Sequence, residues 1–143
     1  IGRRVMDETL RAHLPPNSKV RDAIAVLNRL PEFQKAMTKI VVRMGREDNP
    51  LGKWVVIHGA GTNGGYPVAK AAYDNGIDTV FYIHIDPGHL RRLRDEYGRE
   101  GPKNLVVTGH IASDSIGINI LIGELRKRGL TVDCFGGVLD IER

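Results

Sequence analysis

Three histidines recur at a fixed interval along the chain. His58, His84 and His110 each lie 26 residues after the one before, and each follows a short apolar run. This interval fits one strand and the helix that follows it in an α/β protein. We therefore expect the three side chains to meet at the carboxyl edge of a parallel sheet, which is where such folds bind ligands.

Further metal-binding residue types accompany these histidines. Histidines on adjacent strand ends can reach one ion, because neighbouring strands lie only about 4.8 Å apart. Residues four apart at the start of a helix also lie on nearby faces. We predict a site for a divalent metal ion (zinc, iron or manganese) with ligands among His110, Asp114, His84, Asp86 and His89.

Simpler interpretations of the same residues stay open. A histidine at a strand end is commonly a hydrogen-bonded polar residue with no ligand. Ser113 or Asp114 can cap a helix that begins there, since both residue types are common at that position. Cys134 lies in an apolar run, which favours a buried, unreactive thiol.

A glycine-rich loop is a second candidate site. Residues 59–64 read GAGTNG, a G-x-G-x-x-G pattern between a predicted strand and a predicted helix. Backbone N–H groups at such a helix start bind phosphate, and Asp86 ends the next strand, where a ribose-binding acid is expected. The alternative function is thus a Rossmann-like nucleotide-binding module that uses Gly59, Gly61 and Gly64.

The hydrophobic pattern predicts an α/β fold. Four apolar runs rich in β-branched residues alternate with segments of helical periodicity, and apolar runs of this kind are typical of strands covered on both faces. We predict a mainly parallel open sheet of about four strands with helices on both faces. The predicted strands are 54–57, 79–85, 105–108 and 130–135, and the helices are 66–73, 87–97 and a third that Gly129 ends.

The first third of the chain is predicted to be entirely helical. Residues 1–14 and 20–30 show helical spacing of apolar residues, and a third helix is expected from Pro31 to Met44. We divide the chain into a helical segment, 1–50, and an α/β domain, 51–143, packed as one compact unit. Such helices suit packing or self-association, so a non-catalytic oligomeric adaptor is a third candidate function.

Composition limits the class of protein. The 143 residues suit one domain, and no apolar run is long enough to span a membrane. The net charge of +4 is scattered, and only 6% of residues are aromatic, which argues against nucleic acid as a partner. The single cysteine fits a reducing, cytoplasmic setting. Since the chain begins at Ile1 and not at Met, we expect further sequence upstream.

The segment GHIASDSIG, residues 109–117, resembles a motif of the Nif-three-like family of dinuclear-metal, hexameric proteins. That family has Gly-His followed by Ser-Glu, so His110 matches its ligand histidine and Asp114 replaces its ligand glutamate. The resemblance spans about residues 54–138, and it includes the glycines at 59 and 61, Asp86 and, one position away, His89. It implies one or two divalent metals, a homo-oligomer that is usually hexameric, and an activity labelled GTP cyclohydrolase.

The chain also departs from that family's pattern. Nothing in residues 1–53 matches the family's His-His-Pro ligands, and His84-Ile85 stands where the family has Thr-Gly. Either further ligands lie upstream of Ile1, or His58 and His84 complete a rearranged site. Our leading hypothesis is a metal-dependent hydrolase that acts on a small substrate, a nucleotide being one candidate.

Overall fold

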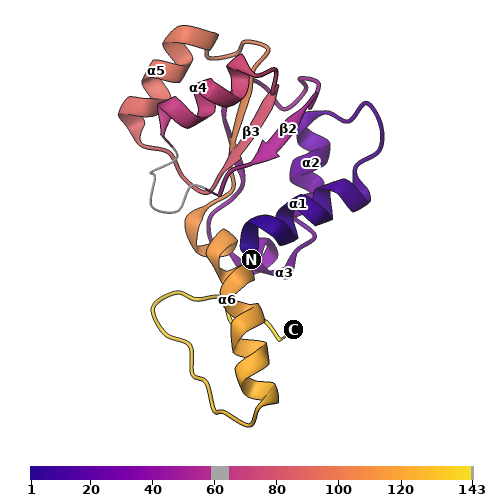
Figure 1. Ribbon diagram of the computed structural model, residues 1–143, viewed down its shortest axis with the longest axis vertical. Coiled ribbons are helices and arrows are strands. Elements are labelled where there is room, and N and C mark those ends of the chain that lie inside the picture. The colour runs from indigo at the N-terminus through magenta and orange to yellow at the C-terminus, as the bar shows by residue number, and fades with distance from the viewer. Residues whose placement is uncertain (59–64, 143) are drawn as a thin grey trace.

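The computed structural model of the chain describes residues 1–58 and 65–142 (Figure 1). Its sheet lies between two groups of helices, and α6 runs away from the body of the molecule. Among the described residues the helices are α1 (Gly2–His13), α2 (Val20–Leu27), α3 (Pro31–Lys35), α4 (Tyr66–Asp74), α5 (Pro87–Tyr97) and α6 (His110–Lys127). The strands are β1 (Val41–Met44), β2 (Trp54–Val56), β3 (Thr79–Tyr82) and β4 (Asn104–Val107).

The four strands form one mixed sheet in the order β1-β4-β3-β2. The strands β2, β3 and β4 are parallel, as predicted, and β1 pairs antiparallel with β4 at one edge. The predicted α/β class, with about four strands and helices on both faces, is confirmed. The one antiparallel strand is β1.

Strand register explains why the histidine spacing matters. Trp54 pairs with Thr79 and Thr79 pairs with Asn104, so each parallel neighbour is offset by 25 residues. Histidines 26 residues apart therefore fall at nearly the same level beyond the carboxyl ends of β2, β3 and β4. The ladder continues to that level, because the Ile83 amide donates to the His58 carbonyl oxygen at 3.2 Å. The predicted meeting of the three histidines at one edge is confirmed.

One face of the sheet packs against the N-terminal helices and α6. Paired positions on β2, β3 and β4 place Val56, Phe81 and Val106 in one row, and all three are buried. Their apolar burial against helices is the main source of stability on this face. The helical residues of this cluster include Met6, Leu10, Val20, Leu27, Phe33, Ala112 and Ile116.

The opposite face carries α4 and α5. Val80, Tyr82 and Leu105 alternate with the residues of the first face, as strand geometry requires. They pack with the buried helical residues Ala69, Tyr73, Leu90 and Leu93. Both faces are thus covered, which accounts for the continuous apolar character of the parallel strands.

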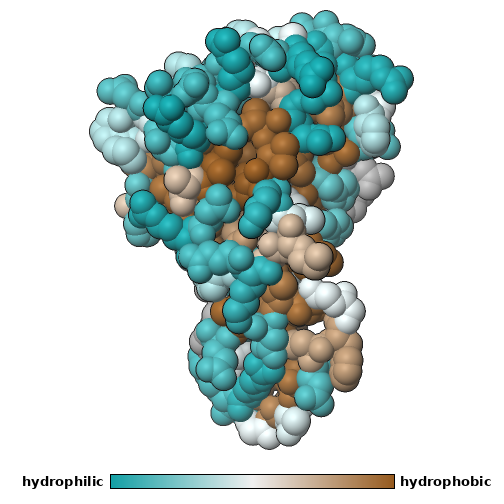
Figure 2. Space-filling view, turned by 180° about the vertical axis from the view of Figure 1, so that it is seen from behind, coloured by the Kyte–Doolittle hydropathy of each residue, from teal (hydrophilic) through white to brown (hydrophobic). Residues whose placement is uncertain are grey.

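Helix α6 extends beyond the sheet, and the segment after it turns back alongside it (Figure 1). Apolar surface is visible on this narrow part of the molecule (Figure 2). None of the described helices combines the length and the apolar character needed to cross a membrane.

The prediction of a helix from Pro31 to Met44 is wrong. Helix α3 ends at Lys35, because Ala36 adopts an extended backbone (φ −66°, ψ 139°), and residues 41–44 form β1 instead. Val41 pairs with Val107 and Val42 with Val106. Long-range pairing of these β-branched residues overrides the local helical pattern. The boundary at residue 50 between two segments stays a prediction.

The strand expected at 130–135 is also wrong. Gly129 (φ 82°) follows the end of α6, and the next residues form no strand. Phe135, expected inside a buried strand, is 82% exposed. The position beside β4 is taken by β1, so the sheet reaches four strands without residues 130–135.

The core predicts a large cost for truncating Phe81. This side chain has no exposed surface and packs edge-on against Trp54, with ring centroids 6.3 Å apart. Phe81→Ala should lower the free energy of unfolding by about 3–5 kcal/mol in urea denaturation. The control Met37→Ala, at a side chain that is 99% exposed, should change it by less than about 0.5 kcal/mol. Equal effects of the two substitutions would contradict this assignment of the core.

Candidate functional site

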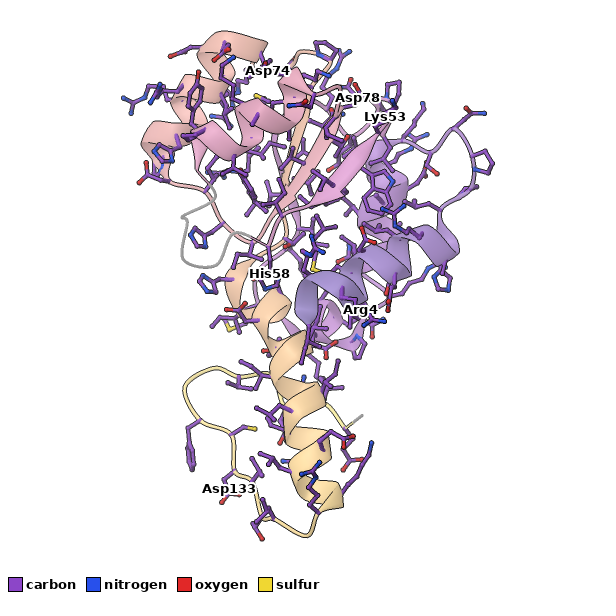
Figure 3. All side chains as sticks on the ribbon, viewed as in Figure 1. Arg4, Lys53, His58, Asp74, Asp78 and Asp133 are labelled. Carbon is purple, nitrogen blue, oxygen red and sulfur yellow. The ribbon has the colours of Figure 1, made fainter. Side chains whose placement is uncertain are left out.

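A single carboxylate joins two of the three edge histidines. His58 Nε2 donates to Asp114 Oδ1 at 2.8 Å, and His110 Nε2 lies 2.9 Å from Asp114 Oδ2, an ion-pair distance. The three residues come from the end of β2 and the first turns of α6, and Figure 3 places His58 where the sheet meets that helix. Both oxygens of Asp114 are therefore used to orient imidazole rings.

Asp114 is available for this role because it does not cap the helix. The N-cap of α6 is Gly109, whose φ of 96° suits glycine, and the helix begins at His110. The expected cap at Ser113 or Asp114 is wrong. Ser113 instead donates its hydroxyl to the Gly109 carbonyl oxygen at 2.6 Å, inside the first turn.

His58 is held in place from both sides. Its side chain is only 19% exposed, and α1 passes so close that a Cβ built on Gly2 would lie 3.1 Å from His58 Cε1. With Nε2 bound to Asp114, the buried Nδ1 has no hydrogen-bond partner among the described residues. A buried ring nitrogen without a partner is costly unless a ligand or a water satisfies it.

His84 and His110 form a second pair. Their rings are stacked at 10° with centroids 4.9 Å apart, and the two Nδ1 atoms are 3.1 Å apart. In a neutral His110 whose Nε2 carries the proton, Nδ1 has a lone pair. The separation is that of a hydrogen bond in which one Nδ1 donates to the other, and it is also near the value of about 3.3 Å expected for two nitrogens that share a tetrahedral zinc ion.

Asp86 and His89 have other surroundings. Asp86 caps α5 and accepts from the amides of Gly88 (2.7 Å) and His89 (3.3 Å). His89 Nδ1 is buried and has no hydrogen-bond partner within the described part of the chain. No hydrogen bond or ion pair between described residues joins Asp86 or His89 to His110 or Asp114.

Within residues 1–58 and 65–142, no group of three or more His, Cys, Asp or Glu side chains could hold a metal ion. The described residues thus offer at most two ligands at one point, and the predicted ligand set stays a prediction. The predicted cofactor-binding glycines, Gly59, Gly61 and Gly64, lie outside the described residues.

A small cavity adjoins the histidine pair. Its volume is about 290 Å³, and it lies between β1 and the carboxyl ends of β3 and β4. Lys39 and Arg43 line it together with His84 and His110. Sequence reasoning missed the two basic residues because it placed them on a helix, and no sequence signal connects β1 with these histidines.

The comparisons with known proteins assign the family of this α/β chain. A crystal structure of a NIF3 superfamily protein from Sphaerobacter thermophilus is 50% identical and superposes with a TM-score of 0.83. The match covers 95% of this chain and 49% of that protein. The chain therefore belongs to the NIF3 superfamily and spans about half the length of this relative.

More distant structures share the fold alone. Two crystal structures of Staphylococcus aureus protein SA1388, one described as a hypothetical protein, are each 13% identical, with TM-scores of 0.51 and 0.53. These matches cover 81% and 84% of this chain, and 35% and 31% of the matched chains. No family model and no curated protein matches the chain.

The geometry predicts a measurable coupling between His58 and Asp114. In a double-mutant cycle with His58→Ala and Asp114→Ala, we expect a coupling free energy of about 1 kcal/mol, because the hydrogen bond is largely shielded from water. The matched control is the Arg4–Glu8 pair on α1, whose side chains are 81% and 59% exposed and should show no measurable coupling. Urea unfolding with a chelator present measures both cycles, and equal couplings would contradict the shielded pair.

Proposed function

We propose that His84 and His110 bind a divalent metal ion through Nδ1 and that the protein is a metal-dependent hydrolase. The observation that carries this proposal is the 3.1 Å approach of the two Nδ1 atoms. The neutral imidazole nitrogen is a good ligand for zinc, iron and manganese. Family membership supports the fold, and the metal and the reaction are our inference.

Asp114 has a defined part in this proposal. A metal-bound histidine almost always donates its other ring N–H to a carboxylate, a carbonyl oxygen or a water, which fixes its tautomer and its orientation. Asp114 Oδ2 lies 2.9 Å from His110 Nε2, so Asp114 is the candidate carboxylate for His110. Direct ligation by Asp114, as the family resemblance implies, is the alternative within the same proposal, and Asp86 and His89 are candidates for a second ion.

The remaining residues suggest how a reaction could proceed. A divalent ion, when bound, lowers the pKa of a coordinated water and so supplies a nucleophile near neutral pH. His58 donates through Nε2 to Asp114, so its part in this proposal is to position that carboxylate. The cavity of about 290 Å³ favours a small substrate. We place this activity in the cytoplasm, in keeping with the single cysteine.

Removing either histidine of the pair should strongly weaken metal binding. His84→Ala and His110→Ala should each weaken Zn²⁺ binding at least about 100-fold, since each removes one of two ligands. Asp114→Asn should weaken it by about 10–100-fold if Asp114 only orients His110. Calorimetric titration of the chelator-treated protein with Zn²⁺, and elemental analysis of the purified protein, provide the measurements.

The control variant is His13→Ala. His13 is exposed on α1, and its Nδ1 lies 2.9 Å from the Thr9 carbonyl oxygen. This variant should bind Zn²⁺ as the unaltered protein does. The proposal is wrong if the unaltered protein takes up no metal, or if the His13 and His110 variants behave alike.

We also propose that the protein self-associates through α6. Ile111, Ile118 and Leu121 lie along one stripe of this helix and are 38–57% exposed. Leu130 and Phe135, in the segment that follows, are 55% and 82% exposed. Exposed apolar surface of this kind is typical of contacts between subunits. A homo-oligomer, a hexamer by the family resemblance, would cover it.

Polar substitution on this stripe should dissociate the oligomer. Ile118→Ser combined with Leu121→Ser removes apolar surface from α6, so we expect a smaller molar mass by light scattering after size exclusion. Met37→Ser, at the fully exposed end of a loop after α3, is the control and should leave the mass unchanged. A monomeric unaltered protein, or an unchanged mass in the α6 double variant, would contradict the proposed interface.

A further inference from the structure

We propose that the cavity beside the histidine pair binds a phosphoryl group of the substrate, and that Lys39 and Arg43 are the residues that contact it. The inference rests on the proposed function in one respect, because it places a substrate group next to the proposed metal ligands. The anion site itself is argued from the charge and shape of the cavity.

The antiparallel strand β1 brings the two cations to the histidines. Lys39 precedes β1 and Arg43 lies within it, and both line the cavity opposite His84 and His110. The segment before β1 lies close to the start of α6, because a Cβ added to Gly109 would lie 3.0 Å from Thr38 Oγ1. Thr38 also lines the cavity and adds a hydroxyl donor.

Among the described residues, the two cations that line this cavity have no carboxylate partner in it, and the acidic residue at the site, Asp114, contacts His110 instead. None of its lining residues is acidic, and no ion pair between described residues includes Lys39 or Arg43. Arg94 lies near Arg43, and Arg99 lies near Arg94. Arg94 donates to the Arg43 carbonyl oxygen at 2.8 Å, and burial together with the charges of Arg99 and Arg43 lowers the pKa of Arg94. A bound anion would relieve this repulsion.

The position and size of the cavity favour a small phosphorylated molecule over a polymer. Helix α6 begins at His110, so its positive N-terminal end adjoins the same cavity. The volume of about 290 Å³ accommodates one compact group. Arginine and lysine bind phosphoryl oxygens through short, charge-assisted hydrogen bonds, and an anion held here lies within reach of a group bound at the histidine pair.

The test uses inorganic phosphate and the chelator-treated protein at pH 8, so that binding does not depend on metal. Phosphate binding is followed by chemical shift changes of backbone amides around β1 and the start of α6. The double variant Lys39→Gln/Arg43→Gln should raise the dissociation constant of phosphate at least about tenfold, because two charge-assisted contacts are lost. Acetate, a singly charged carboxylate probe, should bind the unaltered protein more weakly than phosphate.

The matched control is Arg29→Gln/Arg128→Gln, which removes the same charge from two exposed positions that do not line the cavity. It should bind phosphate as the unaltered protein does. The proposal is overturned if this control loses affinity equally, if the Lys39/Arg43 variant keeps its affinity, or if acetate binds as tightly as phosphate. It is also overturned if the unaltered protein binds no phosphate in the millimolar range.

Metal uptake, measured in parallel with Zn²⁺, separates this inference from the proposed function. The Lys39→Gln/Arg43→Gln variant should bind Zn²⁺ normally. Phosphate binding that depends on Lys39 and Arg43, in a protein that takes up no metal, would support the anion site and overturn only the metal proposal.

Discussion

The contacts of Asp114 with His58, a hydrogen bond, and with His110, an ion-pair distance, tie the candidate site to the fold. His58 ends a strand and His110 begins a helix, so one carboxylate fixes two elements that are far apart in the sequence. The contacts also bear on the chemistry, because a neutral histidine whose Nε2 carries the proton keeps a lone pair on Nδ1. At His110 that lone pair faces His84, and at His58 it lies buried.

The surrounding architecture makes this arrangement possible. Equal offsets between parallel strands bring the three histidines to one level, and burial on both faces of the sheet holds the strands in register. Helix α1 packs against His58, because Gly2 has no side chain and so permits close approach. On the other side, β1 carries Lys39 and Arg43 to the cavity. The candidate site is thus built from elements that come from most of the chain.

The sequence predicts the parallel part of this fold well, because buried strands, glycine or proline boundaries and a regular histidine spacing are local signals. It also indicates His84, His110 and Asp114 as members of one site. It does not predict β1, because an apolar run of this kind is compatible with a helix until its pairing with β4 is known. For the same reason, the sequence does not predict the cavity that Lys39 and Arg43 line. The Asp114–His58 contact depends on α6 starting at His110, and the N-cap Gly109 sets that start. The sequence pattern predicts a later start of the helix, with its cap at Ser113 or Asp114.

The central claim is that His84 and His110 share one metal ion through Nδ1. A crystal of the protein grown with Zn²⁺, with diffraction recorded on both sides of the zinc absorption edge, tests it most directly. The account predicts an anomalous peak about 2.0–2.1 Å from both Nδ1 atoms. A zinc peak elsewhere, or none beside the pair in protein with both rings ordered, would contradict it.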